Sequence, residues 1–317
     1  MRASKSIKLS IAVVVLLTAC GGSGSSQPTI PIKPKITISS TSDPTSVMLA
    51  EIYGQALEKA EFRIARKKAF ATPEALYAAV QSGDVQLTGA TTQALYAWSQ
   101  KQSGKTDPLP PSTALQVDAI SKALPATLKL GSASTAEDKD VIFCSAAFTQ
   151  ANAAAAPTTS PSTSATPAAP AIATLTDLGT KPQTATLAAP DGFDTATPLG
   201  TATLKDTYQI TFKAIVPTAS DKIIDAVTAG TADCGVGRSA DPALAAATFT
   251  VLQDDKAVVP NDVMISLANA AAGTVDVMSV VDATSAKLTT AKLRSLKQRL
   301  KDGATPELVA NEFTASP

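Results

Sequence analysis

The alternation of strand-like and helix-like segments after residue 34 most limits what this chain can fold into. Residues 35–39 are rich in β-branched side chains, and Asp43-Pro44 follows as a capping acid with a proline suited to a first helical turn. Apolar residues then recur at helical spacing over 47–60. Strand and helix patterns repeat over 62–67, 73–80 and 85–88. Two successive βα units predict a parallel sheet with helices on its faces.

The rest of the chain continues this alternation. We predict further strands over 126–130, 141–144, 184–187, 209–212, 232–236 and 263–267. We predict further helices over 112–124, around 201–205, and over 219–229, 274–283, 289–300 and 305–313. Residues 131–138 are small and polar, and we expect the chain to cross there from one domain to another and to return at 251–256. The expected fold class is α/β.

The composition excludes several classes of function. The chain has no histidine, which rules out Ser-His-Asp and Cys-His catalysis and histidine metal sites. Lys plus Arg equals Asp plus Glu at 27 each, and no glycine-rich phosphate loop is present. We therefore expect no nucleic-acid partner, no metal and no cofactor. We also expect no enzymatic activity, although mechanisms based on Lys or Asp remain open.

The N-terminus has the pattern of a secretory signal. Positive charge precedes an apolar run over 9–17 that is too short to span a bilayer. The run ends in LTACG at 17–21, which resembles a bacterial lipoprotein lipobox, and a stretch of Gly and Ser follows it. We predict a signal peptide over 1–19, a lipid on Cys20 and a flexible tether over 20–34. An uncleaved anchor helix is the alternative.

Residues 153–171 consist almost entirely of Ala, Pro, Ser and Thr. Such a tract buries too little apolar surface to order itself. We predict a solvated insertion that is open to glycosylation on Ser and Thr, and a ligand-binding role is the alternative.

Short motifs follow one another in an ordered series along the chain. A strand and a polar loop at 36–40 lead into LAEIYGQALE at 49–58. The second half carries GTAD at 230–233, ADP at 240–242, LQDDK at 252–256, SAKLTT at 285–290 and PELVA at 306–310. In this order the motifs resemble the substrate-binding component of osmoprotectant ABC importers, the glycine betaine, choline and carnitine binding family.

The resemblance implies a two-lobed type II periplasmic-binding-protein fold, in which each lobe is a mostly parallel sheet flanked by helices. Residues 35–132 and 256–317 would form lobe 1, and residues 133–255 would form lobe 2. Two crossing segments, near 131–138 and 254–256, would join the lobes. A solute would then bind in the cleft between lobes that close about a hinge.

Helix N-termini that face such a cleft would offer unpaired N–H groups to a polar solute. This consideration nominates polar loops of both lobes as the ligand site: Ser39, Ser40, Thr41, Asp43, Thr91, Thr92, Arg238, Ser239 and Asp241. The Arg238 guanidinium would clamp a carboxylate or, alternatively, form a structural ion pair. Asp43 and Asp241 precede prolines, so helix capping is their alternative role. For Asp254 and Asp255 we favour a hinge role over acid/base chemistry.

The aromatic residues depart from the family. Quaternary ammonium groups are usually held by stacked aromatic faces. The family has a tyrosine-bearing segment after the third strand, whereas this chain has TGATT at 88–92. Tyr96 and Trp98 follow two residues apart, so they cannot share one helix face, and we expect only one to reach the cleft. A differently shaped polar or apolar solute therefore stays open beside betaine and choline.

Cys144 and Cys234 remain once Cys20 carries the lipid. Both fall in predicted strands of lobe 2, and in the implied type II arrangement the crossing strand that opens this lobe lies beside its later buried strand. We predict a Cys144–Cys234 disulfide, as suits an oxidising compartment, with two free buried thiols as the alternative.

The sequence thus predicts a lipid-anchored protein on the extracytoplasmic face of a bacterial cell membrane. It would bind a small-molecule solute, an osmoprotectant-like quaternary amine or another compound, and deliver it to an ABC permease complex. A surface lipoprotein that keeps the fold but serves envelope interactions is the alternative.

Overall fold

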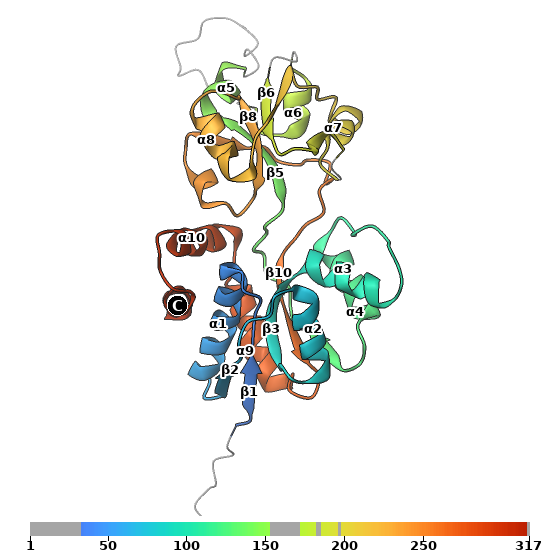
Figure 1. Ribbon diagram of the computed structural model, residues 1–317, viewed down its shortest axis with the longest axis vertical. Coiled ribbons are helices and arrows are strands. Elements are labelled where there is room, and N and C mark those ends of the chain that lie inside the picture. Colours follow the sequence, from blue (N-terminus) through green and yellow to red (C-terminus); the bar gives the residue numbers. More distant parts are fainter. Residues whose placement is uncertain (1–32, 153–171, 182–184, 196–197, 316–317) are drawn as a thin grey trace, which may run out of the picture. The chain divides into compact units, whose positions relative to one another are not determined.

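The computed structural model describes residues 33–152, 172–181, 185–195 and 198–315. Within them lie two five-stranded sheets, each flanked by helices (Figure 1). We call the first sheet with its helices lobe 1 and the second sheet with its helices lobe 2. The predicted signal peptide, Cys20, nearly all of the tether and the insertion at 153–171 lie outside the described residues.

The lobe 1 sheet has the strand order β2-β1-β3-β10-β4. Its strands are β1 (Lys35–Ile38), β2 (Arg63–Arg66), β3 (Leu87–Thr91), β4 (Leu128–Leu130) and β10 (Met264–Asn269). β1 pairs in parallel with β2 and β3, whereas β10 runs antiparallel to β3 and β4. The helices are α1 (Pro44–Lys59), α2 (Pro73–Ser82), α3 (Thr92–Gln102), α4 (Thr113–Ala123), α9 (Val275–Ala286), α10 (Thr290–Lys301) and α11 (Pro306–Ala315).

Helices cover both faces of this sheet, which explains why β10 is an unbroken buried run. Ile265 and Leu267 pack into a cluster with α2, α3 and α4. Met264 and Ala268 point to the other face and pack with residues of α1, α9, α10 and α11. A strand buried on both faces loses the polar alternation of a half-exposed one.

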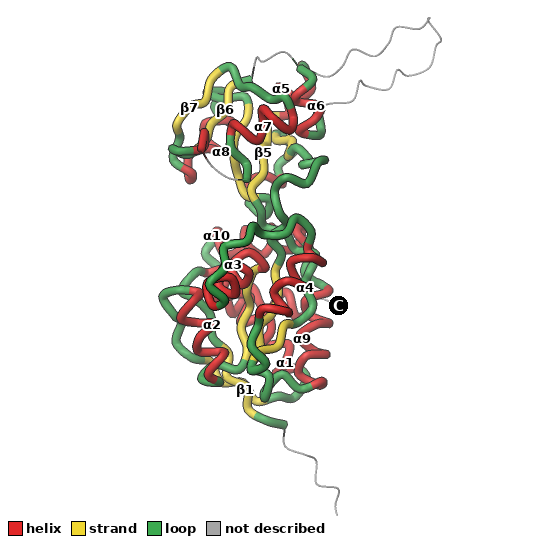
Figure 2. Tube along the Cα trace, turned by 90° about the vertical axis from the view of Figure 1, so that its right-hand side faces the viewer, coloured by secondary structure: helices red, strands yellow, loops and turns green. Residues whose placement is uncertain are grey.

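The lobe 2 sheet repeats this arrangement with the order β7-β6-β8-β5-β9. Its strands are β5 (Asp140–Ser145), β6 (Thr186–Ala189), β7 (Ala214–Pro217), β8 (Cys234–Arg238) and β9 (Phe249–Val251). Figure 2 shows β6 and β7 side by side, and they pair in parallel, whereas β5 runs antiparallel to β8 and β9. Its helices are α5 (Ala146–Ala151), α6 (Leu175–Gly179), α7 (Thr201–Tyr208) and α8 (Ile223–Thr228), with 3-10 turns η1 (Phe193–Thr195), η2 (Ser220–Lys222) and η3 (Pro242–Ala245).

In each sheet the antiparallel strand is the one that the chain enters after leaving the other sheet. β4 leads to β5 through 131–139, and β9 leads to β10 through 252–263. The first connecting segment bonds to the second and to the start of β10: Asp138 N–H donates to Asp262 C=O at 2.8 Å, and Ser134 N–H donates to Met264 C=O at 2.9 Å. The connection between the lobes is therefore a short hydrogen-bonded ladder. None of the helices described is long and apolar enough to cross a membrane.

The strand that we predicted at 209–212 is wrong. Gln209 ends α7 in the left-handed conformation at φ 59°, and the strand that pairs with β6 begins five residues later at Ala214. Ile210 is nevertheless buried in the lobe 2 core. Its apolar side chain packs from a loop, so hydrophobicity alone gave a false strand signal. The helix predicted at 219–229 is divided into η2 and α8.

The predicted disulfide is present. Cys144 on β5 lies directly opposite Cys234 on β8, and the two are bonded across a sequence separation of 90. Both side chains are fully buried in the lobe 2 core. The bond therefore fixes the antiparallel pair of strands at the centre of this lobe.

We expect the double variant Cys144→Ala/Cys234→Ala to lose about 4 kcal/mol of unfolding free energy, because closing a loop of this length lowers the entropy of the unfolded chain. Urea denaturation measures the loss, and reduced wild-type protein is the matched control. In a Cys20→Ala background, unfolded but unreduced protein should show no thiol to a labelling reagent. Stoichiometric labelling of two thiols would contradict the bond.

Candidate functional site

A pocket of about 270 Å³ lies at the N-terminal ends of α1 and α3. The loop into α1 contributes Thr41 and Asp43, the end of β3 contributes Gly89 to Thr91, and Leu76 and Tyr77 come from α2. Arg238, Asp138 and Asp262 line it from the ends of strands and from the connecting segments, and Lys297 reaches it from α10. The volume is near the lower end of the range for small-molecule sites.

Local sequence explains why both helices begin at the pocket. Asp43 accepts the Ser46 N–H at 3.0 Å and so caps α1, as the Asp43-Pro44 pattern predicted. Thr91 ends β3 and at once caps α3 by accepting the Ala94 N–H. Gly89 permits the close approach of the two elements, because a Cβ at this position would lie 2.7 Å from the Leu49 Cβ of α1.

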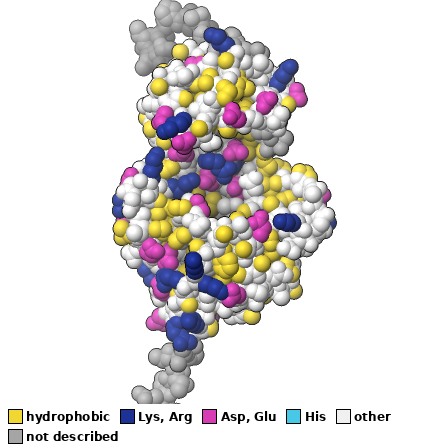
Figure 3. All heavy atoms as spheres, in the orientation of Figure 1, with side chains coloured by type: hydrophobic (Ala, Val, Ile, Leu, Met, Phe, Trp, Pro, Cys, Tyr) yellow, Lys and Arg dark blue, Asp and Glu magenta, His cyan; other side chains and the backbone are white. Residues whose placement is uncertain are grey.

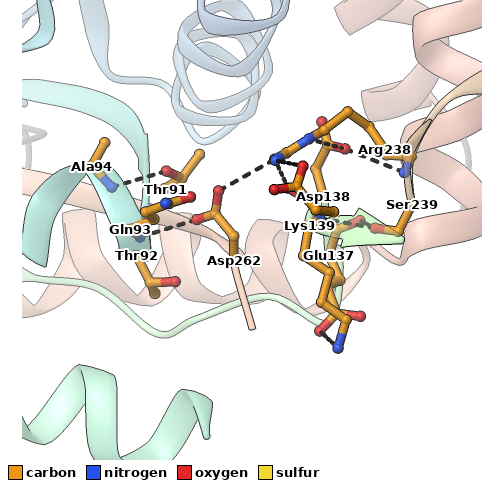
Figure 4. A network of polar contacts seen from close by, with 12 residues as sticks. Thr91, Thr92, Gln93, Ala94, Glu137, Asp138, Lys139, Arg238, Ser239 and Asp262 are labelled. Atoms are coloured by element: carbon orange, nitrogen blue, oxygen red, sulfur yellow. Dashed lines mark hydrogen bonds and ion pairs between the residues drawn. The ribbon is translucent and has the colours of Figure 1, made fainter. Parts of the chain in front are cut away.

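Arg238 is the centre of a charged network at the pocket (Figure 4). Its Nη1 donates to Asp140 at 3.0 Å, its Nη2 donates to the Asp138 carbonyl, and its Nε lies 3.4 Å from the Asp138 carboxylate. Nη2 also lies 3.6 Å from Asp262, and Lys297 Nζ lies 2.9 Å from the second oxygen of Asp138. Arg238 and Asp140 are direct partners across β8 and β5, an opposite-charge pair suited to that position.

Burial and neighbouring opposite charges shift the pKa values of Asp262 and Arg238 in opposite directions. Burial raises the pKa of Asp262, and hydrogen bonds from the Gln93 N–H and the Thr91 hydroxyl, together with the Arg238 charge, offset only part of that rise. Burial lowers the pKa of Arg238, but the nearby Asp138, Asp140 and Asp262 outweigh it and raise the pKa overall. The arginine therefore stays charged, whereas the charge of Asp262 is incompletely compensated.

The structure brings some of the predicted ligand residues together and separates others. Thr41, Asp43, Thr91 and Arg238 line the pocket. Ser39 donates to the Lys68 carbonyl, Thr92 accepts the Val263 N–H, and Ser40 is buried. Ser239 lines a different cavity of about 470 Å³, and Asp241 caps η3 by accepting the Ala243 N–H.

Sequence reasoning missed Tyr77, Asp138, Asp262 and Lys297. Tyr77 lies in a predicted helix, and its three-residue spacing to the apolar Val80 is typical of a core position. Asp262 lies in a short segment before β10 with no motif around it. Only the pairing of the two connecting segments brings it to the pocket.

Neither Tyr96 nor Trp98 lines the pocket, in contrast to the expectation that one would. Tyr96 donates its hydroxyl to the Pro108 carbonyl at 3.1 Å. Trp98 packs edge-to-face against Tyr77, with ring centroids 5.7 Å apart. Among the described residues, Tyr77 is therefore the aromatic side chain of the pocket.

Asp254 and Asp255 hold the return segment in place. Asp254 accepts the N–H groups of Val258 and Val259 at 3.1 and 2.7 Å and the hydroxyl of Tyr208. Asp255 accepts the Thr176 N–H at 3.2 Å. Within the ranges that the structure describes, no group of Cys, Asp and Glu side chains is placed to hold a metal ion. Figure 3 shows Lys and Arg intermingled with Asp and Glu on the visible face, without a broad positive surface there.

We expect Arg238→Ala to lower the unfolding free energy by about 1–3 kcal/mol at neutral pH, because it leaves part-buried carboxylates without their cation. A carboxyl whose folded pKa is raised destabilises the fold as pH rises through that pKa, so the loss should shrink as the carboxyls protonate. Urea denaturation at pH 7 and pH 4 measures both values. Lys122→Ala removes an exposed pair with Asp118 and should cost under about 0.5 kcal/mol. An equal loss for Arg238→Ala at both pH values would contradict an electrostatic cause.

A known protein family and solved structures resemble this chain. Residues 34–316 match the family described as the substrate binding domain of ABC-type glycine betaine transport systems. The crystal structure of a glycine betaine/carnitine/choline ABC transporter is similar with a TM-score of 0.73 and 15% identity, covering 88% of this chain and 97% of that one. Apo YehZ from Escherichia coli is similar with a TM-score of 0.69 and 16% identity, covering 88% and 97%.

A search of curated protein sequences finds no match. The two structural likenesses are distant in sequence and speak for a shared two-lobed fold. The family match extends over nearly the whole described chain, including both lobes and both connecting segments. This chain therefore belongs to the family of substrate-binding domains of ABC-type glycine betaine transport systems.

Proposed function

We propose that this protein captures one small solute in the 270 Å³ pocket and delivers it to an ABC permease complex. In this proposal residues 35–132 and 256–317 act as one lobe and residues 133–255 as the other. The observation that carries the proposal is the lining of the pocket. It combines the N-terminal ends of two lobe 1 helices with Arg238 from lobe 2 and with Asp138 and Asp262 from the segments between the lobes.

That lining supports a coupling between binding and lobe movement. Asp138 N–H bonds to the Asp262 carbonyl, so the two pocket carboxylates belong to the ladder that joins the lobes. A solute that contacts either carboxylate acts directly on the segments about which the lobes would turn. Ligand-dependent closure of this kind is the usual device of two-lobed binding proteins.

We expect the purified mature protein to gain thermal stability with a bound solute. Binding to the folded state alone adds about 2.7 kcal/mol at 100-fold above Kd, which visibly raises the melting temperature. A thermal-shift panel of glycine betaine, choline, carnitine, proline betaine, amino acids, sugars and aromatic compounds makes the measurement, and native mass spectrometry detects any co-purified ligand.

A pocket-filling variant tests whether the pocket is the site. Ala94→Phe fills the pocket and should abolish the shift, whereas Ala78→Phe, on an exposed face of α2 outside the pocket, should keep it. If neither the panel nor mass spectrometry finds a ligand, the importer role is wrong and an envelope-interaction role takes its place.

We further propose that a lipid on Cys20 holds the protein on the extracytoplasmic face of the cell membrane. The support is the LTACG sequence at 17–21 after a short apolar run, together with a stretch of Gly and Ser that suits a tether.

Cys20→Ala should move the protein from the membrane to the soluble fraction, because the substitution removes the attachment site. Its melting temperature should stay the same, since both sheets begin after residue 34. Cell fractionation follows the location, and mass spectrometry follows the mass of the N-terminal peptide. Ser26→Ala, in the same Gly and Ser stretch, is the matched control and should remain in the membrane fraction. An unmodified, soluble wild-type protein in a lipoprotein-processing host would refute the anchor.

A further inference from the structure

The charges that line the pocket do not balance. Asp43, Asp138 and Asp262 face Arg238 and Lys297 there. Both cations already have close carboxylate partners, since Lys297 lies 2.9 Å from Asp138 and Arg238 lies 3.0 Å from Asp140 outside the lining. Neither is therefore available to bind an anionic group of a solute without losing a pair. The pocket is consequently poor in spare positive charge.

The negative charge of Asp262 is only partly compensated. This residue is 5% exposed, and the cation nearest to it, Arg238, lies 3.6 Å away, beyond good hydrogen-bond distance. The Gln93 N–H binds one carboxylate oxygen at 3.0 Å. This donor is neutral, so it solvates the carboxylate but does not cancel its charge. A cation in the pocket would compensate the charge of the Asp262 carboxylate.

Tyr77 is a second, independent sign of a polar solute. It lines the same pocket, and the residue as a whole is 3% exposed. Its hydroxyl bonds to no residue in the described ranges, yet its oxygen is not among the sealed polar atoms that lack a partner, so it is open to the pocket. A bound N–H group would give this oxygen a donor. Asp262 is close enough for its charge to raise the pKa of the Tyr77 phenol, after the larger effect of burial. Both groups line the same pocket, so they can act on one ligand.

We propose that the pocket takes a small cation that carries N–H donors, a primary ammonium or a guanidinium, with the Asp262 carboxylate and the Tyr77 oxygen as its acceptors. The inference rests on the proposed solute-binding function and names its substrate class. A positively charged N–H group interacts with a carboxylate through electrostatic attraction and a hydrogen bond together. A quaternary ammonium has no N–H to donate and needs several aromatic faces, whereas the described lining offers the ring of Tyr77.

In this assignment Arg238 is a positioning residue. Its bonds to Asp138 and Asp140 hold the connecting segments that present Asp262. The first turn of α3 also positions Asp262, because the Gln93 N–H donates to its carboxylate.

Calorimetry on the purified mature protein tests the class with four probes. Putrescine and agmatine carry N–H donors, choline is quaternary, and succinate is an anion. We expect binding of putrescine or agmatine, no binding of succinate, and at least 10-fold weaker binding of choline. Asp262→Asn keeps the shape of the side chain and should weaken the cation at least 10-fold. Tyr77→Phe should weaken it about 5-fold.

Asp241→Asn changes a helix-capping carboxylate outside the pocket and should leave the affinity unchanged. Because Tyr77→Phe removes one oxygen without touching the charged network, it keeps the test valid if Asp262→Asn unfolds. Tighter binding of choline or succinate than of the N–H cations, or affinities that both variants leave intact, would overturn the substrate class while solute binding stands. If none of the probes and no member of the wider panel binds, both the class and the solute-binding function are wrong.

Discussion

The contact between Arg238 and the aspartates of the connecting segments organises this molecule. Arg238 stands at the end of β8, Asp140 begins β5, and Asp138 and Asp262 lie in the two segments that join the sheets. One guanidinium thus contacts every route by which the chain passes from lobe to lobe. Planar arginine suits this place because its five donors can serve several acceptors at once.

The C-terminal helices α10 and α11 connect this charged network to the apolar core. Arg294 of α10 donates a hydrogen bond of 2.6 Å to the carbonyl of Ser239, which is the residue that follows Arg238. Two alanines are fully buried in a cluster with apolar residues of α1, α10 and α11. They are Ala136, in the segment from β4 to β5, and Ala240, two residues after the end of β8. The region between the lobes therefore has its own apolar support. This support keeps the polar network at a defined place on lobe 1.

The sequence predicted the alternation of elements because each signal was local. A capping acid before proline gave the start of α1, and helical spacing gave its length. The disulfide could also be predicted, because the fold implied by the family resemblance places the strands of Cys144 and Cys234 side by side. The strand at 209–212 failed for a non-local reason: Ile210 is apolar since it packs on lobe 2 from a loop. Periodicity over four residues cannot separate these cases.

The site was harder to predict than the fold, because its chemistry depends on partners far apart in sequence. Arg238 was nominated from residue type as a clamp for a carboxylate, but the sequence carries no sign that Asp138, Asp140 and Asp262 converge on it. Asp262 became a pocket residue only through the pairing of segments more than a hundred residues apart. The sign of charge that a pocket offers is thus a property of its unpaired groups. A conspicuous arginine with three acidic neighbours presents less positive charge than its residue type suggests, and a carboxylate in an unremarkable stretch of sequence can decide which solutes fit.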